Sequence, residues 1–225
     1  MADRPPTRVL LADDHPLIRE GLRACLSTVP HIQIVGEAVD GQDAIEKTRV
    51  LAPDVILMDL NMPRLGGLAA IAQILRDSPH MRIVALTVHR QLEYSVEILL
   101  SGAHGHVSKD APPAELIQAI ETVAQGGTHF DVAATVQYLR RYAPSPARAA
   151  VAPSKALTPR EEEVLALVAD GLSNRQIAAR LKIGVRTVET HRERLMRKLD
   201  IHNVAGLTRF AVAHGMAVRG VSEKT

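Results

Sequence analysis

Residues 55–63 read VILMDLNMP, and this stretch decides the fold of the first half of the chain. Four apolar residues, typical of a buried strand, are followed by the carboxylate of Asp59 and by a loop that Pro63 closes. In an open parallel sheet, ligands and chemistry gather at the carboxyl ends of the strands. Asp59 is therefore the first candidate for a functional residue.

Other strand-like runs in the same half of the chain also end in polar groups. Residues 9–15, VLLADDH, contain Asp13 and Asp14, and residues 105–109, GHVSK, end in Lys109. Thr87 ends a further apolar run. Any one of these acids is best interpreted as a solvated loop residue. The whole set at strand ends of one domain instead predicts a single site for a cation and a phosphoryl group.

The residue types in this set favour phosphoryl transfer. Three converging carboxylates would repel one another unless a divalent cation lay among them, and oxygen ligands favour Mg²⁺. A carboxylate beside Mg²⁺ can attack a phosphoryl group and form an acyl phosphate. Lys109 would supply a positive charge and Thr87 a hydroxyl donor, because negative charge builds on the phosphoryl oxygens.

Residues 7–125 alternate between short apolar runs and amphipathic segments of helical length. We expect strands at residues 8–12, 33–38, 55–59, 83–87 and 105–108. We expect helices at residues 16–28, 41–51, 67–77, 92–101 and 114–125. Five such units predict an α/β fold with a doubly wound, five-stranded parallel sheet.

The length and charge of the chain indicate two domains. The 225 residues are enough for two cores, with a predicted first domain at 1–125, a linker at 126–154 and a second domain at 155–225. Residues 1–125 have 11 Lys and Arg against 16 Asp and Glu, a net charge of −5, whereas residues 154–225 have 13 against 8, a net charge of +5. Cys25 is the only cysteine, and no apolar run approaches the roughly 20 residues that span a bilayer. We therefore expect a soluble, cytoplasmic protein without membrane contact.

The end of the chain is predicted to be all-helical. After a segment at 133–141 that could be helical, the proline- and alanine-rich residues 142–155 indicate an exposed linker. Thr158 with Glu161, and Ser173 with Gln176, have the spacing of capping boxes. Two further helices are expected at about 186–199 and 203–214. Two short helices around the turn at Gly184 are typical of a helix-turn-helix, so the second domain is predicted as an all-α, four-helix unit.

The motifs LLADDH, LMDLNMP with Gly67, ALTVH and GAHGHVSKD resemble the receiver domain of bacterial two-component response regulators, a flavodoxin-like fold. The resemblance covers about residues 7–125. It implies that Asp59 accepts a phosphoryl group from a sensor histidine kinase. It also implies that Mg²⁺ is held by Asp13, Asp14, Asp59 and the backbone carbonyl of Asn61, while Thr87 and Lys109 contact the phosphate.

One residue departs from the receiver pattern. Receivers usually have Tyr or Phe three residues before the lysine, as a switch that moves with Thr87, and this chain has His106 there. His106 can be interpreted as a tolerated, half-exposed histidine on an edge strand. Alternatively, its imidazole performs the switch, which would make signalling sensitive to pH because histidine titrates near neutrality.

Residues 157–201 read LTPREEEVLALVADGLSNRQIAARLKIGVRTVETHRERLMRKLDI. This stretch resembles the LuxR-type DNA-binding domain of NarL/FixJ-type response regulators, and the resemblance spans about residues 155–218. Phe210 is the only aromatic residue in this part, so duplex DNA fits better than a stacked single strand. By helix-turn-helix geometry the third helix reads bases and flanking groups contact phosphate. The predicted DNA contacts are Glu189, Thr190 and Glu193 near bases, and Asn174, Arg175, Arg186, Thr187, His191, Arg194 and Lys198 near phosphates or flanking groups. A solvated basic face on a helical bundle is the alternative.

The fourth helix has an apolar stripe that could serve both the domain core and a partner, and the resemblance implies that it is a dimer surface. Its members are Val204, Leu207, Phe210 and Ala211. We therefore expect a transcription regulator that is a homodimer when active, bound to two-fold related half-sites, with RNA polymerase as a further candidate partner. One rival is a dehalogenase-like phosphatase, although Asn61 stands where those enzymes have a second aspartate. A second rival is a DNA-binding protein whose receiver acts without phosphorylation.

Overall fold

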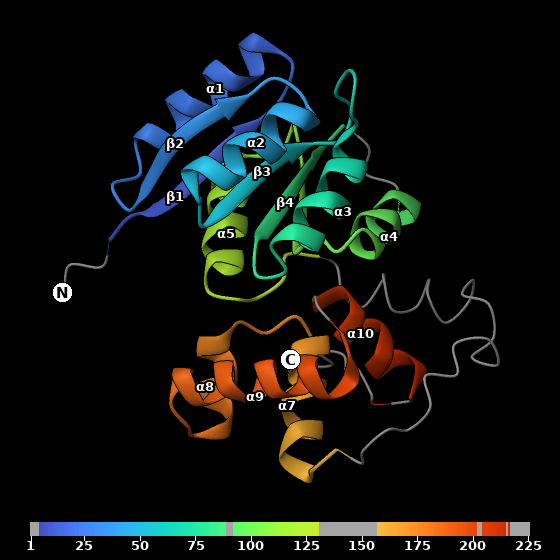
Figure 1. Cartoon of the computed structure of the whole chain (residues 1–225). Coiled ribbons are helices and arrows are strands. Elements are labelled where there is room, and N and C mark those ends of the chain that lie inside the picture. Colours follow the sequence, from blue (N-terminus) through green and yellow to red (C-terminus); the bar gives the residue numbers. More distant parts are fainter. Residues whose placement is uncertain (1–4, 89–91, 131–156, 202–203, 215, 217–225) are drawn as a thin grey trace.

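The computed structural model describes residues 5–88, 92–130, 157–201, 204–214 and 216. In the first domain, strands and helices alternate along the chain (Figure 1). The strands are β1 (Thr7–Ala12), β2 (Ile32–Ala38), β3 (Val55–Asp59), β4 (Arg82–Thr87) and β5 (Gly105–Ser108). The helices are α1 (Pro16–Ser27), α2 (Gly41–Leu51), α3 (Gly67–Asp77), α4 (Leu92–Leu100) and α5 (Pro113–Ala124).

The strands form one parallel sheet with the order β2-β1-β3-β4-β5. The predicted doubly wound fold is therefore confirmed, and each predicted strand and helix lies within about one residue of an observed one. The chain passes from β1 to β2 on one side and then to β3 on the other. Such a reversal opens a crevice at the carboxyl ends of β1 and β3, where Asp13 and Asp59 lie.

Both faces of the sheet are buried, which explains why the strands are continuously apolar. Alternate residues point to opposite faces: Leu10 and Ile56 pack with α2, α3 and α4, whereas Val9 and Leu57 pack with α1 and α5. All four side chains are fully buried. The two faces together fix the position of every strand end, and therefore of the side chains that follow the strands.

The second domain consists of α7 (Pro159–Ala169), α8 (Asn174–Leu181), α9 (Val185–Leu199) and α10 (Val204–Ala213). Both predicted capping boxes are present, at Thr158 with Glu161 and at Ser173 with Gln176. Gly184 precedes α9 without a side-chain cap. A separate apolar core, which includes Val164, Ile177 and Leu195, holds the four helices together.

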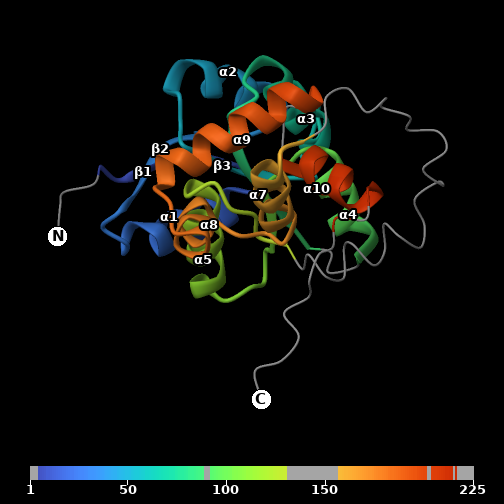
Figure 2. The same ribbon diagram turned by 90° about the horizontal axis from the view of Figure 1, so that it is seen from below.

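The helical domain packs against the end of the sheet where the strands begin (Figures 1 and 2). None of the helices in the described ranges is long and apolar enough to cross a membrane. The predicted helical segment at 133–141 and the predicted linker at 142–155 lie outside the described residues.

Candidate functional site

Buried carboxylates meet at the carboxyl end of the sheet. Asp13 follows β1 and Asp59 ends the neighbouring β3, and they are 0% and 1% exposed. Lys109, which follows β5, places its Nζ 2.7 Å from an Oδ2 oxygen of each carboxylate. One ammonium group therefore bridges two buried acids that come from different strands.

The charges in this cluster do not cancel. Burial of the Lys109 ammonium would lower its pKa, but the hydrogen bonds and charges of Asp13 and Asp59 outweigh burial and raise that pKa. Lys109 is therefore positively charged at neutral pH. Asp14 adds a third carboxylate beside these two. A cation is the natural complement of a site with three acids and one ammonium group.

The donors in this cluster fit Mg²⁺. One ligand atom from each of Asp13, Asp14, His15 and Asp59 lies within 4.8 Å of the others, and three of these atoms are carboxylate oxygens. Asn61, whose carbonyl is the predicted fourth ligand, donates its backbone N–H to Asp59 Oδ1 at 3.2 Å. The loop that carries Asn61 is therefore held beside Asp59.

Glycine at position 67 is required by the close approach of α3 to this loop. The backbone N–H of Gly67 donates to the carbonyl of Leu60 at 3.0 Å. A β-carbon on Gly67 would lie 2.1 Å from the carbonyl oxygen of Asp59, far inside van der Waals contact. The helix can therefore close the Asp59 loop only if its first residue has no side chain.

The remaining predicted receiver residues also lie at this edge. Thr87, at the end of β4, is 1% exposed, and its carbonyl accepts from the backbone N–H of Lys109 at 2.8 Å. The structure therefore brings together the strand-end residues that were predicted as one site. They are Asp13, Asp14, Asp59, Thr87 and Lys109.

His15 belongs to the same cluster, although it was not predicted from the sequence. Its Nδ1 lies 2.8 Å from Asp14 Oδ1 and 3.3 Å from Asp13 Oδ1, and its side chain is largely exposed. The available signal was its position directly after the two aspartates. The side chain of a residue three positions beyond the end of β1 can point toward the sheet edge or away from it, so only the folded loop shows that the His15 ring turns back toward the aspartates.

His106 is half-buried on β5 and is connected to α4. Its Nε2 lies 3.2 Å from the hydroxyl of Ser95, and its ring lies 5.5 Å from that of Phe130. Burial lowers the pKa of His106, the charge of His129 lowers it further, and Glu115 acts in the opposite direction. The ring therefore sits in surroundings that favour its neutral form.

The predicted base-reading side of α9 faces the receiver. Glu189 and Glu193 line a cavity of about 130 Å³ between the two domains, opposite His80, Arg82 and His104. Figure 2 shows α9 running across the receiver. Several predicted contact residues are exposed, namely Arg175 on α8 and Arg186, Thr187 and Arg194 on α9. Thr190 and His191 are half-buried.

Two predicted phosphate contacts are engaged inside the protein. Asn174 is 6% exposed and accepts a hydrogen bond of 2.6 Å from Arg192. Lys198 donates to Glu161 at 2.8 Å. Arg192 itself was not selected from the sequence, because it shares the inward stripe of α9 with Val188 and Leu195, where an apolar residue is expected.

The core of its own domain takes up part of the apolar stripe on α10 that is predicted as a dimer surface. Leu207 and Ala211 are both 0% exposed and belong to the core of their own domain, so neither is available to a partner in this structure. The reason is that α10 packs along α7 and needs its apolar stripe for that contact. Phe210 is half-buried and stacks on His214, and the side chain of Val204 lies outside the described residues.

Cationic groups are crowded at the domain boundary. Burial, followed by the charges of Arg192 and Arg82, lowers the pKa of His104 to about 3. Burial and then the charge of Arg82 lower the pKa of Arg192 to about 10, and Glu189 opposes this shift. At neutral pH His104 is therefore neutral and Arg192 is charged.

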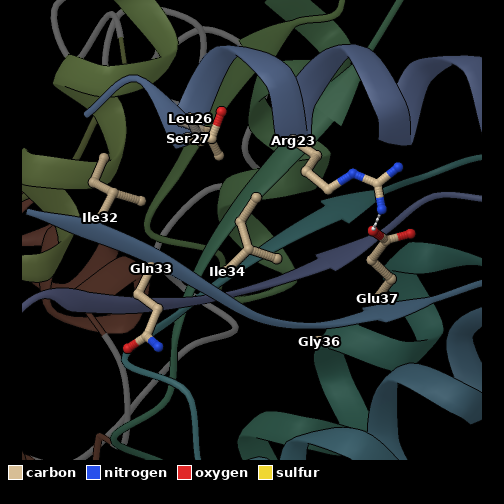
Figure 3. A pocket seen from close by; sticks show the side chains of 8 residues that line it. All are labelled: Arg23, Leu26, Ser27, Ile32, Gln33, Ile34, Gly36 and Glu37. Atoms are coloured by element: carbon tan, nitrogen blue, oxygen red, sulfur yellow. Dashed lines mark hydrogen bonds and ion pairs between the residues drawn. The ribbon is translucent and has the colours of Figure 1, made fainter. Parts of the chain in front are cut away.

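A larger hollow of about 570 Å³ lies between α1 and β2 (Figure 3). Leu26, Ile32 and Ile34 line it, and Arg23 reaches from α1 to form an ion pair with Glu37 at 3.2 Å. None of its lining residues belongs to the acidic cluster or to the predicted DNA contacts. This hollow is therefore separate from both candidate sites.

Comparison with known proteins agrees with both halves of the structure. Residues 9–121 match the family model for the response regulator receiver domain, and residues 155–211 match the model for bacterial regulatory proteins of the luxR family. The transcriptional regulatory protein MctR of Rhizobium johnstonii is 41% identical over 216 residues, which cover 96% of this chain and 98% of MctR. The response regulator UvrY of Escherichia coli is 36% identical, covering 92% of this chain and 94% of UvrY.

Solved structures show the same relationship. A structure of the two-component response regulator RcsB in complex with DNA is 27% identical and has a TM-score of 0.53, covering 92% of this chain and 98% of RcsB. The matched families are transcription regulators and not enzymes, so the phosphatase interpretation is excluded. The chain belongs to the two-component response regulators that combine a receiver domain with a LuxR-type helix-turn-helix DNA-binding domain.

Proposed function

We propose that Asp59 accepts a phosphoryl group from the phosphohistidine of a sensor kinase. The observation that carries this proposal is the bridge that Lys109 forms between Asp13 and Asp59, at 2.7 Å from each. An Asp59 carboxylate oxygen attacks phosphorus, the P–N bond breaks, and the electron pair returns to the imidazole, which then takes up a proton. Because the nucleophile is already ionised, no general base is needed.

The chain's own residues position this reaction. Asp13, Asp14, Asp59 and the carbonyl of Asn61 would hold Mg²⁺, which neutralises phosphoryl charge when bound. Lys109 would move from its carboxylate contacts to a phosphoryl oxygen, and the Thr87 hydroxyl would donate to another. Both residues would then transmit the state of Asp59 to β4 and β5, with His106 as the switch residue.

The output of the switch is binding to duplex DNA through α9, in the cytoplasm. RcsB, which resembles this chain along most of its length, has been solved bound to DNA. Glu189 and Glu193, which we propose contact bases, line the cavity between the domains, so the receiver at 1–125 and the DNA-binding domain at 155–225 would have to part around the linker at 126–154. Phosphorylation would favour the separated form and homodimerisation, with RNA polymerase as a downstream partner.

Phosphorylation can be tested directly by mass spectrometry after incubation with acetyl phosphate. The wild-type chain should gain one phosphoryl group when Mg²⁺ is present and none when it is chelated. Asp59→Asn should gain none, whereas Asp77→Asn, which removes an exposed aspartate from the end of α3, should behave like the wild type. Equal labelling of Asp59→Asn would contradict the proposal.

DNA binding is tested with and without beryllofluoride, which mimics the acyl phosphate. Beryllofluoride should strengthen duplex binding by the wild type and leave Asp59→Asn unchanged. Affinity should fall steeply with salt, because each neutralised phosphate releases counterions. Equal binding with and without the mimic would instead favour a receiver that acts independently of phosphorylation.

A further inference from the structure

The acidic cluster at the carboxyl end of the sheet includes an imidazole nitrogen. Nδ1 of His15 lies 2.8 Å from Oδ1 of Asp14 and 3.3 Å from Oδ1 of Asp13. One ligand atom from each of these three residues and from Asp59 lies within 4.8 Å of all the others. Three carboxylates and one imidazole are therefore close enough together to bind the same cation.

The contact between His15 and Asp14 has the spacing of two metal ligands but not the alignment of a hydrogen bond. Oδ1 of Asp14 is a buried atom without a hydrogen-bond partner among the residues that the structure describes, although Nδ1 of His15 is only 2.8 Å away. Around an ion with bonds of about 2.1 Å, neighbouring donor atoms lie about 3 Å apart. A cation would therefore satisfy both atoms at close to their present separation.

The backbone that carries the His15 ring is held in place. The backbone N–H of His15 donates to Oδ1 of Asp13 at 2.8 Å, and its carbonyl accepts from the backbone N–H of Arg19 at 3.1 Å. The guanidinium of Arg19 donates to the carbonyl of Asp13 at 2.7 Å, and α1 begins at Pro16, directly after His15. Only the side-chain bonds of His15 remain to be ordered when a cation binds, so the entropic cost of binding is small.

The His15 ring also lies at the entrance of the site. Its side chain is 61% exposed, whereas Asp13 and Asp59 are buried. The exposed ring can carry its proton on Nε2 and donate it to water, which leaves the lone pair of Nδ1 for a metal ion. A cation that enters from solvent would therefore meet a ring nitrogen and carboxylate oxygens together.

Imidazole changes which cations such a site prefers. Mg²⁺ binds oxygen ligands and water, whereas imidazole nitrogen is a good ligand for Zn²⁺, Fe²⁺ and Ni²⁺. We propose that Nδ1 of His15 joins the three carboxylates as a metal ligand, so that the site binds a first-row transition-metal dication such as Zn²⁺ more tightly than Mg²⁺. The two ions compete for the same carboxylates. This role for His15 rests on the proposed phosphoacceptor site at Asp59.

Coordination by His15 can be observed with long-range ¹H–¹⁵N NMR of the full-length chain during titration with one equivalent of Zn²⁺. The ¹⁵N shift of Nδ1 should move to the range of metal-bound imidazole, while Nε2 stays protonated. Mg²⁺ should not produce this change, because it keeps to oxygen ligands. His31, which is 57% exposed and lies beside the single carboxylate of Glu121, is the internal control and should not respond. A Zn²⁺ complex in which Nδ1 of His15 is unchanged would overturn the proposal.

The preference between the two ions is tested by calorimetry with Zn²⁺ and with Mg²⁺. His15→Asn replaces the ring nitrogen with an amide oxygen and places a good N-cap residue before α1, so the variant should fold. Its affinity for Zn²⁺ should fall at least about tenfold, while its affinity for Mg²⁺ should change little. His31→Asn should match the wild type with both ions, and thermal melting shows that each variant is folded. Equal losses for Zn²⁺ and Mg²⁺ in His15→Asn would show that His15 only shapes the loop.

The outcomes separate the role of His15 from the proposed function. If Zn²⁺ binds without a response at His15, and Asp59 is still phosphorylated in the presence of Mg²⁺, His15 is not a ligand and the phosphoacceptor site stands. If neither Zn²⁺ nor Mg²⁺ binds to the wild-type chain, the acidic cluster is not a cation site. The proposed Mg²⁺ dependence and the role of His15 then fail together.

Discussion

The Nε2 of His106 lies 3.2 Å from the hydroxyl of Ser95, so the switch position on β5 is connected to α4 by one pair of side chains. Ser95 is buried, and α4 lies beside α10 of the DNA-binding domain (Figures 1 and 2). The histidine ring is therefore placed between the edge of the sheet that carries Asp59 and a helix that contacts the second domain. Movement of His106 would change how α4 presents itself to α10.

Replacing His106 should remove the pH dependence of the switch. The pKa of His106 is lowered mainly by burial and then by His129, with Glu115 opposing, so this arrangement favours neutral imidazole. Acidification below the ordinary histidine pKa should protonate the imidazole and so disfavour this arrangement. DNA binding without beryllofluoride should then rise. His106→Phe should remove that part of the pH dependence, measured as affinity against pH, and Ser95→Ala should leave the histidine free to titrate. An unchanged pH profile in His106→Phe would refute a switch role.

His104 should make the stability of the chain depend on pH. Its pKa is about 3 in the folded chain and 6.5 ordinarily, so folding favours the neutral form. The contribution of neutral His104 to stability is complete above pH 6.5 and is lost as the pH falls from there toward 3. The free energy of unfolding should fall by about 1 kcal/mol between about pH 7.5 and pH 5.5 from this residue.

Urea unfolding of His104→Gln, compared with the wild type at each pH, isolates this contribution. The difference between the two proteins should shrink as the pH falls. His214→Gln, an exposed histidine in the other domain, serves as the control. Parallel pH profiles for the wild type and His104→Gln would show that His104 is not responsible.

Removing Lys109 should destabilise the receiver and make it depend on cations. Without the ammonium group, Asp13 and Asp59 are buried carboxylates that have lost their shared positive partner, and the free energy of unfolding should fall by about 3 kcal/mol. Mg²⁺ should restore more stability to Lys109→Met than to the wild type. Lys47→Met, which removes a half-exposed lysine paired with Asp43, should change little. A Mg²⁺ effect equal in all three proteins would contradict this account.

The same substitution should have opposite effects at two glycines. A β-carbon on Gly67 meets the backbone of Asp59 at 2.1 Å, so Gly67→Ala should lower the free energy of unfolding by about 2 kcal/mol and slow phosphorylation. Gly21 lies inside α1 with nothing within 4 Å of its β-carbon position, so Gly21→Ala should raise stability by about 0.5–1 kcal/mol. Chemical denaturation of both variants checks the prediction, and a loss of stability at both positions would show that close approach is not the cause.

Local patterns were enough to predict the order of the elements and the strand-end acids. The continuous apolar runs of β1 and β3 can only be buried on both faces, so they predict a parallel sheet, and that topology places Asp13 beside Asp59. The capping boxes at Thr158 and Ser173 are also local, because each needs only a few consecutive residues. Arg192 was not predicted as a functional residue, because the other inward-facing residues of α9 are apolar.

The sequence by itself determined the fold of each domain and predicted the acidic cluster around Asp59, because strand periodicity, helix caps and strand-end residues act over short distances or through one sheet. Only the tertiary structure decided that Leu207 and Ala211 are core residues, that His106 meets Ser95, and that Arg192 reaches the carbonyl of Gly126. Each of these contacts depends on the packing of elements that are remote in sequence. Local periodicity does not predict which of two possible partners an apolar stripe or a long side chain will contact.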